Sequence, residues 1–235
     1  MDIVRRMRHI VAMGGGGFSM EPDNPLLDEY ILGLARREHP RVCFLPTASG
    51  DSEGYVEQFH SAFSGRAETS ELALFRLDGR DLRAFVLNQD VIYVGGGSTV
   101  NLLALWRIHG LDAWLEEANA PGVVLAGISA GALCWFEAGV TDSYGPLGAL
   151  HDGLGLLRGS FCPHYDGEPA RPEAYRTAVA EGLPAGLAAD DGVAAHFVDG
   201  TLRAAVTSRP HATLHRVERC SGRVLETPLP THHLG

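Results

Sequence analysis

The sequence predicts an α/β protein: a three-layer sandwich whose central sheet is mostly parallel, with an antiparallel edge formed by the C-terminal part of the chain. In the first half, short β-rich runs alternate with longer runs of helical spacing, joined by short connections. In the last fifth, short runs alternate between apolar and polar residues and are separated by turn residues. With 235 residues and 45% hydrophobic content, the chain can bury a sizeable core, and we expect a single domain over residues 1–235.

The first half supplies the parallel strands and their helices. We expect strands at residues 9–13, 42–45, 72–76, 91–94 and 123–128, and helical patterns at 26–38, 55–63 and 100–118. The first helical pattern places apolar side chains at Leu27, Tyr30, Ile31 and Leu34. The run VVLAGI at 123–128 is apolar throughout, which is typical of a strand in the middle of a parallel sheet.

The alternation of strand-like and helical runs weakens after about residue 140. Residues 145–175 are rich in Gly and Pro and are predicted to form loops laid over the scaffold. Three alternating runs follow, VAAHFVDG, TLRAAVT and TLHRVER, and we expect them to form antiparallel strands joined by turns such as Asp199-Gly200.

The charge composition excludes several classes of function. There are 19 basic and 29 acidic residues, a net charge of −10, and every basic residue is Arg. This balance argues against nucleic acid or an anionic membrane as a partner. The absence of Lys from the sequence also excludes a Lys Schiff base and the Lys of a phosphate-binding P-loop.

Cysteine spacing and the N-terminal segment bear on metal binding and location. Cys43, Cys134, Cys162 and Cys220 are scattered without a CxxC pair, so we expect reduced thiols, no metal site and no cofactor. The apolar run before the first glycines is too short for a signal peptide or a membrane span. We therefore expect a cytoplasmic protein.

The sequence VVLAGISAGALCWFE carries the strongest functional pattern. Gly127, Ser129 and Gly131 form a G-x-S-x-G sequence between a predicted strand and a helical run, which is the pattern of a turn that presents a nucleophilic serine. The N–H of Ala130 would then point to the position of an oxyanion. The alternative is a serine that caps a helix beside packing glycines.

Two further glycine runs follow predicted strands. Gly95, Gly96 and Gly97 end the strand at 91–94, and parallel strands bring such turns to the same sheet edge as Ser129. Gly96 could donate a second N–H to the oxyanion, or these glycines could only lead into the helix that follows. The run from Gly14 to Gly17 fits a phosphate-binding turn less well than a tight crossover in which no side chain fits.

A catalytic serine needs a base and an acid that orients it. His164, in FCPHYD, opens a loop after a short apolar run and is the predicted base. Asp191, which precedes the strand VAAHFV, is the predicted acid by its position, with Asp190 and Asp142 as alternatives. Each of these aspartates could instead be an ordinary turn residue.

Taken together, YVGGGSTVNLL, GISAGALCW, FCPHYD and the ADDG segment resemble, in this order and at these distances, the peptidase E family of serine peptidases. The resemblance extends from the first strand to about residue 200 and implies a fold like that of class I glutamine amidotransferases. It implies Ser129 as nucleophile, His164 as base and Asp191 as orienting acid, with oxyanion N–H groups from Gly96 and Ala130. The best-known aspartyl dipeptidase of that family has Glu where this chain has the shorter Asp191.

The resemblance also implies a substrate: a dipeptide or short peptide whose N-terminal residue, Asp in the family's named activity, is removed. Such a site needs a cation for the substrate carboxylate and an acid for the free amine. We expect Arg171 in the first role and Asp166 or Glu168 in the second. A solvated loop is the alternative for all three residues, and the oligomeric state stays open, a homodimer included.

Other functions remain as alternatives. A broader serine aminopeptidase and a cyanophycinase-like hydrolase would use the same triad. A non-catalytic amidotransferase-like binding domain would keep the fold without it. A glutaminase is disfavoured because its chemistry places Cys at the turn that holds Ser129 here, whereas Cys134 lies beyond that turn.

Overall fold

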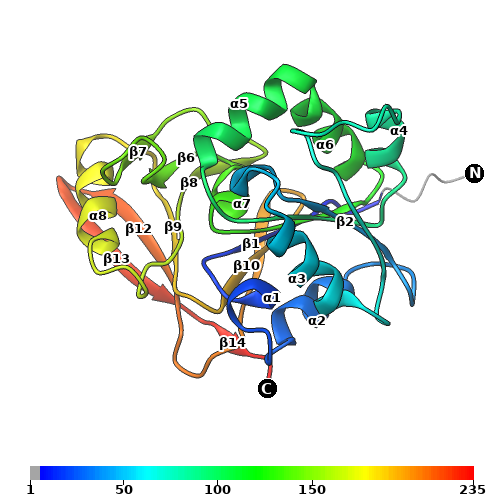
Figure 1. The fold of residues 1–235 in the computed structure, drawn as a ribbon. Coiled ribbons are helices and arrows are strands. Elements are labelled where there is room, and N and C mark those ends of the chain that lie inside the picture. Colours follow the sequence, from blue (N-terminus) through cyan, green and yellow to red (C-terminus); the bar gives the residue numbers. More distant parts are fainter. Residues whose placement is uncertain (1–5) are drawn as a thin grey trace, which may run out of the picture.

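A computed structural model describes residues 6–235 (Figure 1). Within them, the larger sheet has eight strands in the order β14-β11-β10-β1-β5-β4-β2-β3. Its parallel part contains β1 (His9–Met13), β5 (Val124–Ile128), β4 (Val91–Val94), β2 (Arg41–Leu45) and β3 (Glu68–Glu71). Its antiparallel edge contains β10 (Val193–Val198) and β11 (Thr201–Thr207), beside which the short β14 (His232–His233) runs parallel to β11. The predicted sheet, mostly parallel with an antiparallel C-terminal edge, is confirmed.

Helices cover both faces of this sheet because its central strands are buried on both sides. Along β1, Ile10 and Ala12 join one apolar cluster, whereas Val11 and Met13 join the other. The first cluster packs against α4 (Leu82–Leu87), α5 (Thr99–His109) and α6 (Leu111–Asn119), and the second against α1 (Gly17–Met20), α2 (Leu26–Leu32) and α3 (Glu53–Phe63). The expected three-layer arrangement is therefore present. Of the helices formed by residues 6–235, none is long and apolar enough to cross a membrane.

A second sheet of six strands, in the order β13-β12-β9-β8-β6-β7, lies beside the first. It contains β6 (Phe136–Thr141), β7 (Gly148–Leu150), β8 (Leu157–Cys162), β9 (Gly186–Ala189), β12 (Leu214–Cys220) and β13 (Arg223–Leu229). Helix α8 (Arg171–Glu181) packs on it through Tyr175 and Val179, on the far side from α4 to α6 in Figure 1. Between the sheets, the short α7 (Ala130–Leu133) links β5 to β6, and a 3-10 turn (Thr47–Ser49) follows β2.

The structure corrects three sequence-based expectations. Residues 145–175 were predicted to be loops, but they contain β7, β8 and the first turns of α8. Their glycines favoured loops, but Gly159 lies within β8, where a Cβ would overlap the carbonyl of Ala185. A strand was expected at 72–76, but the strand in this region, β3, lies earlier and ends at Glu71. The segment TLHRVER does form an antiparallel strand, β12, but it lies in the second sheet.

A histidine pair, of which His196 is buried and His9 half-buried, lies at the end of β1 opposite the functional turns. His196 of β10 is only 5% exposed, its Nε2 lies 3.0 Å from His9 Nδ1, and its Nδ1 lies 2.7 Å from the Tyr30 hydroxyl. Burial, together with the nearby charges of His9 and Arg203, lowers the pKa of His196 from 6.5 to about 4. This pair is therefore built into the sheet in the neutral state.

We expect the stability of the protein to fall between pH 6.5 and pH 4. In this range the unfolded chain binds a proton at His196 that the folded protein does not, which costs up to about 3 kcal/mol of unfolding free energy at the acid end. Urea denaturation at several pH values, for the wild type and His196→Gln, measures this contribution. Equal pH slopes for the two proteins would show that His196 does not contribute it.

Candidate active site

Ser129 lies on a strained turn between β5 and α7. Its φ is 55°, a left-handed conformation that side chains other than Gly rarely adopt. The flanking glycines make the turn possible, because a Cβ on Gly127 would overlap the carbonyl of Gly131, and one on Gly131 would overlap that of Val94. These contacts match the strained turn that the G-x-S-x-G pattern predicts. Helix α7 has only four residues, so any anion stabilisation here comes from individual N–H groups rather than from a long helix.

The triple-glycine turn after β4 lies against this serine. A Cβ on Gly96 would be 3.4 Å from Ser129 Cβ and 3.9 Å from its Oγ. The N–H of Gly96 donates to the hydroxyl of Tyr55 on α3 at 3.3 Å. Among residues 6–235, the N–H groups of Ala130 and Gly97 have no hydrogen-bond acceptor. The expected turn is present, and Tyr55 is a partner for it that the sequence did not indicate.

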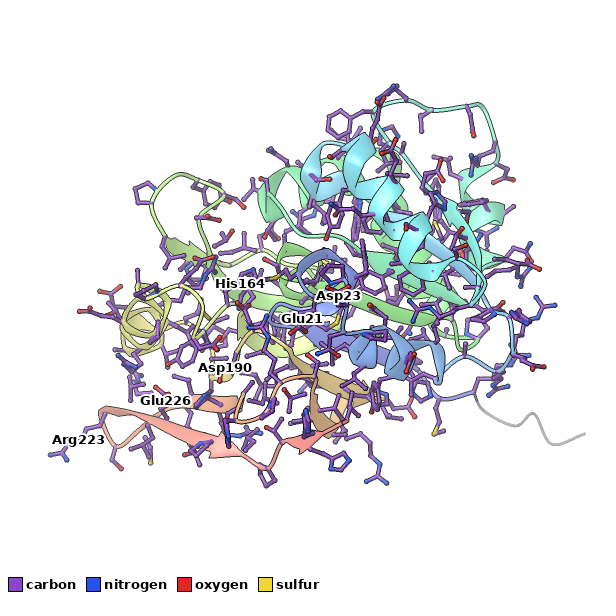
Figure 2. The ribbon with its side chains drawn as sticks, turned by 60° about the horizontal axis from the view of Figure 1, so that its bottom comes forward. Glu21, Asp23, His164, Asp190, Arg223 and Glu226 are labelled. Carbon is purple, nitrogen blue, oxygen red and sulfur yellow. The ribbon has the colours of Figure 1, made fainter. Side chains whose placement is uncertain are left out.

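His164 and Asp191 complete a chain of hydrogen bonds from Ser129. His164 Nε2 lies 2.8 Å from Ser129 Oγ, and His164 Nδ1 lies 2.7 Å from Asp191 Oδ1. His164 follows the end of β8 with a φ of 52°, and Figure 2 shows it between the α1 segment and α8. Burial by itself would raise the pKa of the Asp191 carboxyl, but the hydrogen bond from His164 and the charges of Arg209 and Arg171 lower it below its usual value. Asp191 is therefore an ionised partner for the imidazole.

The backbone after β1 holds all three parts of this chain. The carbonyl of Met13 accepts the N–H of Ser129 at 3.0 Å, and the carbonyl of Gly14 accepts the N–H of His164 at 3.2 Å. The carbonyl of Gly15 accepts the N–H of Gly192, next to Asp191, at 3.0 Å. The absence of side chains here is required, because a Cβ on Gly15 would overlap the Asp191 carboxylate. The run Gly14 to Gly17 thus includes the tight crossover that we expected from the sequence, and it lies against His164 and Asp191.

The remaining candidate acids are placed elsewhere. Asp166 is exposed, and its Oδ1 accepts the backbone N–H of Asp191 at 2.7 Å, while its predicted substrate role stays a prediction. Asp190, 8% exposed, accepts the N–H of Thr213 at 2.8 Å on the opposite side of the chain. Asp142 is exposed in the loop between β6 and β7. The sequence left Asp191, Asp190 and Asp142 open as the acid that orients His164, and Asp191 is the one that contacts it.

Arg171 and Glu168, the other predicted substrate-binding residues, bind each other. Arg171 begins α8 and is only 4% exposed. Its Nε lies 2.7 Å from Glu168 Oε2, a second nitrogen lies 3.1 Å from Glu168 Oε1, and a third lies 3.4 Å from the carbonyl of Val140. The guanidinium is therefore already neutralised by a carboxylate in this structure. Their predicted substrate roles stay predictions, and the contacts favour a structural role.

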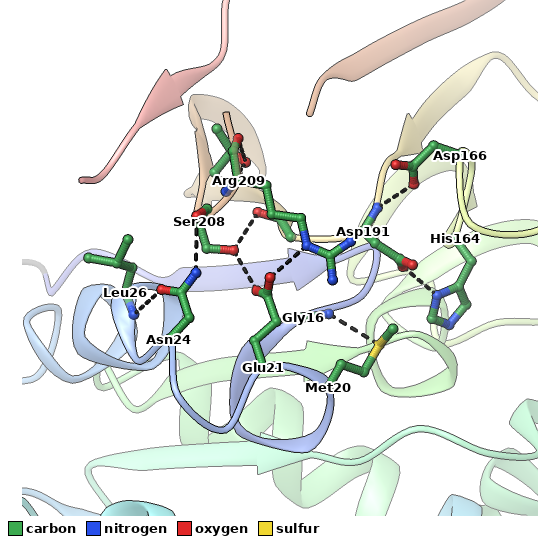
Figure 3. A network of polar contacts seen from close by, with 12 residues as sticks. Gly16, Met20, Glu21, Asn24, Leu26, His164, Asp166, Asp191, Ser208 and Arg209 are labelled. Atoms are coloured by element: carbon green, nitrogen blue, oxygen red, sulfur yellow. Dashed lines mark hydrogen bonds and ion pairs between the residues drawn. The ribbon is translucent and has the colours of Figure 1, made fainter. Parts of the chain in front are cut away.

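A second arginine near the triad lies in a network that the sequence did not reveal (Figure 3). Arg209, in the connection between β11 and β12, pairs with Glu21 at 2.6 Å, and Glu21 also accepts the hydroxyl of Ser208 at 2.6 Å. The stem of Arg209 lies over Gly192, where a Cβ would be 2.8 Å from Arg209 Cγ. This network ties the segment after α1 to the chain beside Asp191. No spacing or motif in the sequence connects residues so far apart.

Neither a thiol nucleophile nor a metal cluster is found beside the triad. Cys134, the residue directly after α7, is fully buried, and its Sγ lies 3.2 Å from the carbonyl of Gly131. Burial raises the pKa of its thiol well above the usual value. Among residues 6–235, no group of three or more His, Cys, Asp or Glu side chains is arranged to hold a metal ion. The hydrogen-bonded chain of Ser129, His164 and Asp191 is an arrangement that can activate a serine hydroxyl.

Comparison with known proteins agrees with this site. The model of the family described as Peptidase family S51 matches residues 10–205. A curated protein of Bacillus subtilis (strain 168), named as the uncharacterized peptidase YgaJ, is 55% identical over 231 residues, which cover 97% of this chain and 100% of that protein.

Two crystal structures share the fold. A candidate peptidase E protein from Listeria monocytogenes EGD-e is 20% identical with a TM-score of 0.60, covering 95% of this chain and 100% of the other. A peptidase from an acI-B1 Actinobacterium is 18% identical with a TM-score of 0.66, covering 97% of this chain and 96% of the other. The family match and the identity to YgaJ show that this chain belongs to peptidase family S51, a family of serine peptidases.

Proposed function

We propose that this protein is a serine exopeptidase that removes the N-terminal residue from dipeptides or short peptides. The observation that carries the proposal is the continuous chain from Ser129 Oγ through the His164 imidazole to the Asp191 carboxylate, with contacts of 2.8 and 2.7 Å. A serine hydroxyl is a weak nucleophile until a base can take its proton. The geometry supports that activation without movement of either partner.

In the proposed reaction, Ser129 Oγ attacks the carbonyl carbon of the scissile bond while its proton passes to His164 Nε2. The imidazolium is stabilised by Asp191, and the oxyanion accepts the N–H of Ala130. A second N–H comes from the triple-glycine turn, either from Gly96, as predicted, or from Gly97. His164 then gives its proton to the leaving amine. The resulting ester is hydrolysed by water in the reverse sequence of proton transfers, which restores Ser129.

The charges around the triad bear on which N-terminal residue is removed. The two arginines whose charges reach Asp191 are each paired with a carboxylate, Arg171 with Glu168 and Arg209 with Glu21. An Asp side chain of a substrate would have to compete with these carboxylates for either guanidinium. Of the specificities that the sequence left open, these pairs favour a broader aminopeptidase over an enzyme restricted to Asp-X.

We expect Ser129→Ala to lower kcat/KM for peptides by about 10⁴-fold or more, with the fold unchanged, because the nucleophile is removed. The assay compares both proteins on Asp-X, Asn-X, Leu-X and Met-X dipeptides, on longer peptides with the same ends, and on a polymer with β-Asp-Arg bonds. Serine-dependent cleavage of several N-terminal residues supports the broad enzyme, and cleavage of Asp-X alone supports the aspartyl dipeptidase. Release of Asp-Arg supports a cyanophycinase-like hydrolase. No cleavage of any substrate favours the binding domain.

Gly15→Ala tests the geometry of the triad from the backbone side. The new Cβ would overlap the Asp191 carboxylate, so we expect the acid to move away from His164 and kcat to fall by roughly 100-fold or more. Gly54→Ala, on α3, is the matched control, because a Cβ there meets nothing within 4 Å. Circular dichroism checks that both variants fold. Wild-type kcat in folded Gly15→Ala would contradict the placement of Asp191.

A further inference from the structure

A second set of polar contacts lies directly behind the triad. Asp190 precedes the triad acid, and its Oδ1 lies 3.7 Å from His215 Nε2 on β12. The other ring nitrogen, Nδ1, lies 3.4 Å from Glu226 Oε1 on β13, without the alignment of a hydrogen bond. Glu226 in turn accepts the hydroxyl of Tyr165 at 2.8 Å. Figure 2 shows Asp190 between His164 and Glu226.

In two chain segments, residues that contact the triad stand next to residues that face His215 or Glu226. In the segment after β8, His164 and Asp166 contact the triad acid, whereas Tyr165 between them faces the second sheet. In the turn before β10, Asp191 contacts His164, whereas Asp190 faces His215. The same two segments are therefore held on one side by the triad and on the other by His215 and Glu226.

We propose that His215 is a positioning residue for the catalytic acid: in its protonated form it bridges Asp190 and Glu226, fixes the turn that carries Asp191, and supports catalysis until it loses its proton. This inference rests on the proposed function, since it assigns a role in the same reaction. His215 does not touch the reacting atoms and acts only through the Asp190–Asp191 turn.

The charges around His215 support the protonated form. Carboxylates face it from the turn before β10 and from β13, and Asp166 adds a third negative charge nearby. The Tyr165 ring lies 5.3 Å from the imidazole, and Arg176 of α8 compensates Glu226 at 3.1 Å. Contact with Asp190 raises the pKa of His215, against the opposing effect of burial. A group whose pKa is raised on folding stabilises the folded state at pH values below that pKa. Protonated His215 therefore stabilises the Asp190–Asp191 turn at lower pH, and this stabilisation is lost as the pH rises through the pKa of His215.

The test compares wild type, His215→Gln, His215→Lys and the control His39→Gln, an exposed histidine on the loop before β2, over pH 6 to 10. We expect His215→Gln to lower kcat roughly tenfold with little change in KM, and to remove the alkaline fall in kcat. His215→Lys should restore kcat and move that fall upward, because an ammonium keeps its proton to higher pH. His39→Gln should behave as the wild type.

A readout independent of turnover is the low-field proton NMR signal of the hydrogen bond between His164 Nδ1 and Asp191. In the wild type it should broaden or shift as His215 titrates, and in His215→Lys it should persist to higher pH. If the wild type cleaves no peptide, the proposed function fails, and this signal still decides the role of His215. If the His215 variants do not fold, the wild-type titration decides. Unchanged kcat, pH profile and NMR signal in folded His215→Gln, even with a lower Tm, would overturn the proposal.

Discussion

Three consecutive backbone carbonyls at the end of β1 are the constraint on which the rest of the site depends. Those of Met13, Gly14 and Gly15 accept N–H groups from Ser129, from His164 and from the residue after Asp191. These partners come from three separate parts of the chain and from both sheets. Because peptide groups are rigid and closely spaced, one short stretch of backbone sets the spacing of nucleophile, base and acid. A Cβ on Gly14 would overlap the carbonyl of Ala189 and one on Gly15 the carboxylate of Asp191, which explains these two glycines.

The alternation of apolar strands and helical patterns was enough to predict the central sheet, because the strands in its middle, β5, β4 and β2, are apolar runs buried on both faces. That Ser129, His164 and Asp191 meet could also be predicted, since Ser129 lies in a strand-to-helix pattern, and His164 and Asp191 belong to segments resembling the same family. The second sheet could not be predicted in this way. Its strands β6 to β9 each contain a glycine and lie among loop-like segments, and although β12 was expected to be a strand, only pairing with distant segments assigns it to this sheet.

Contacts made across long sequence distances account for the rest of what the sequence did not show. Tyr55 of α3 accepts the N–H of Gly96 in the turn after β4, and Glu21 meets Arg209 across almost the whole chain. The prediction for Arg171 shows a different, local difficulty. A charged residue close to His164 in sequence is a reasonable ligand for a substrate, but Glu168, only three residues earlier, pairs with it in the structure. Sequence shows which charges are near each other, but not which of them remain unpaired.

The order of the triad along the chain has a consequence for biosynthesis. The backbone that supports the site lies near residue 14, the proposed nucleophile at residue 129, the proposed base at 164 and the proposed acid at 191, on the crossing from β9 in one sheet to β10 in the other. A nascent chain leaves the ribosome from its N-terminus, so the serine emerges long before the carboxylate that orients its base. An incomplete polypeptide therefore cannot form the Ser129–His164–Asp191 arrangement. The site proposed to hydrolyse peptides is complete only after the crossing between the two sheets has folded.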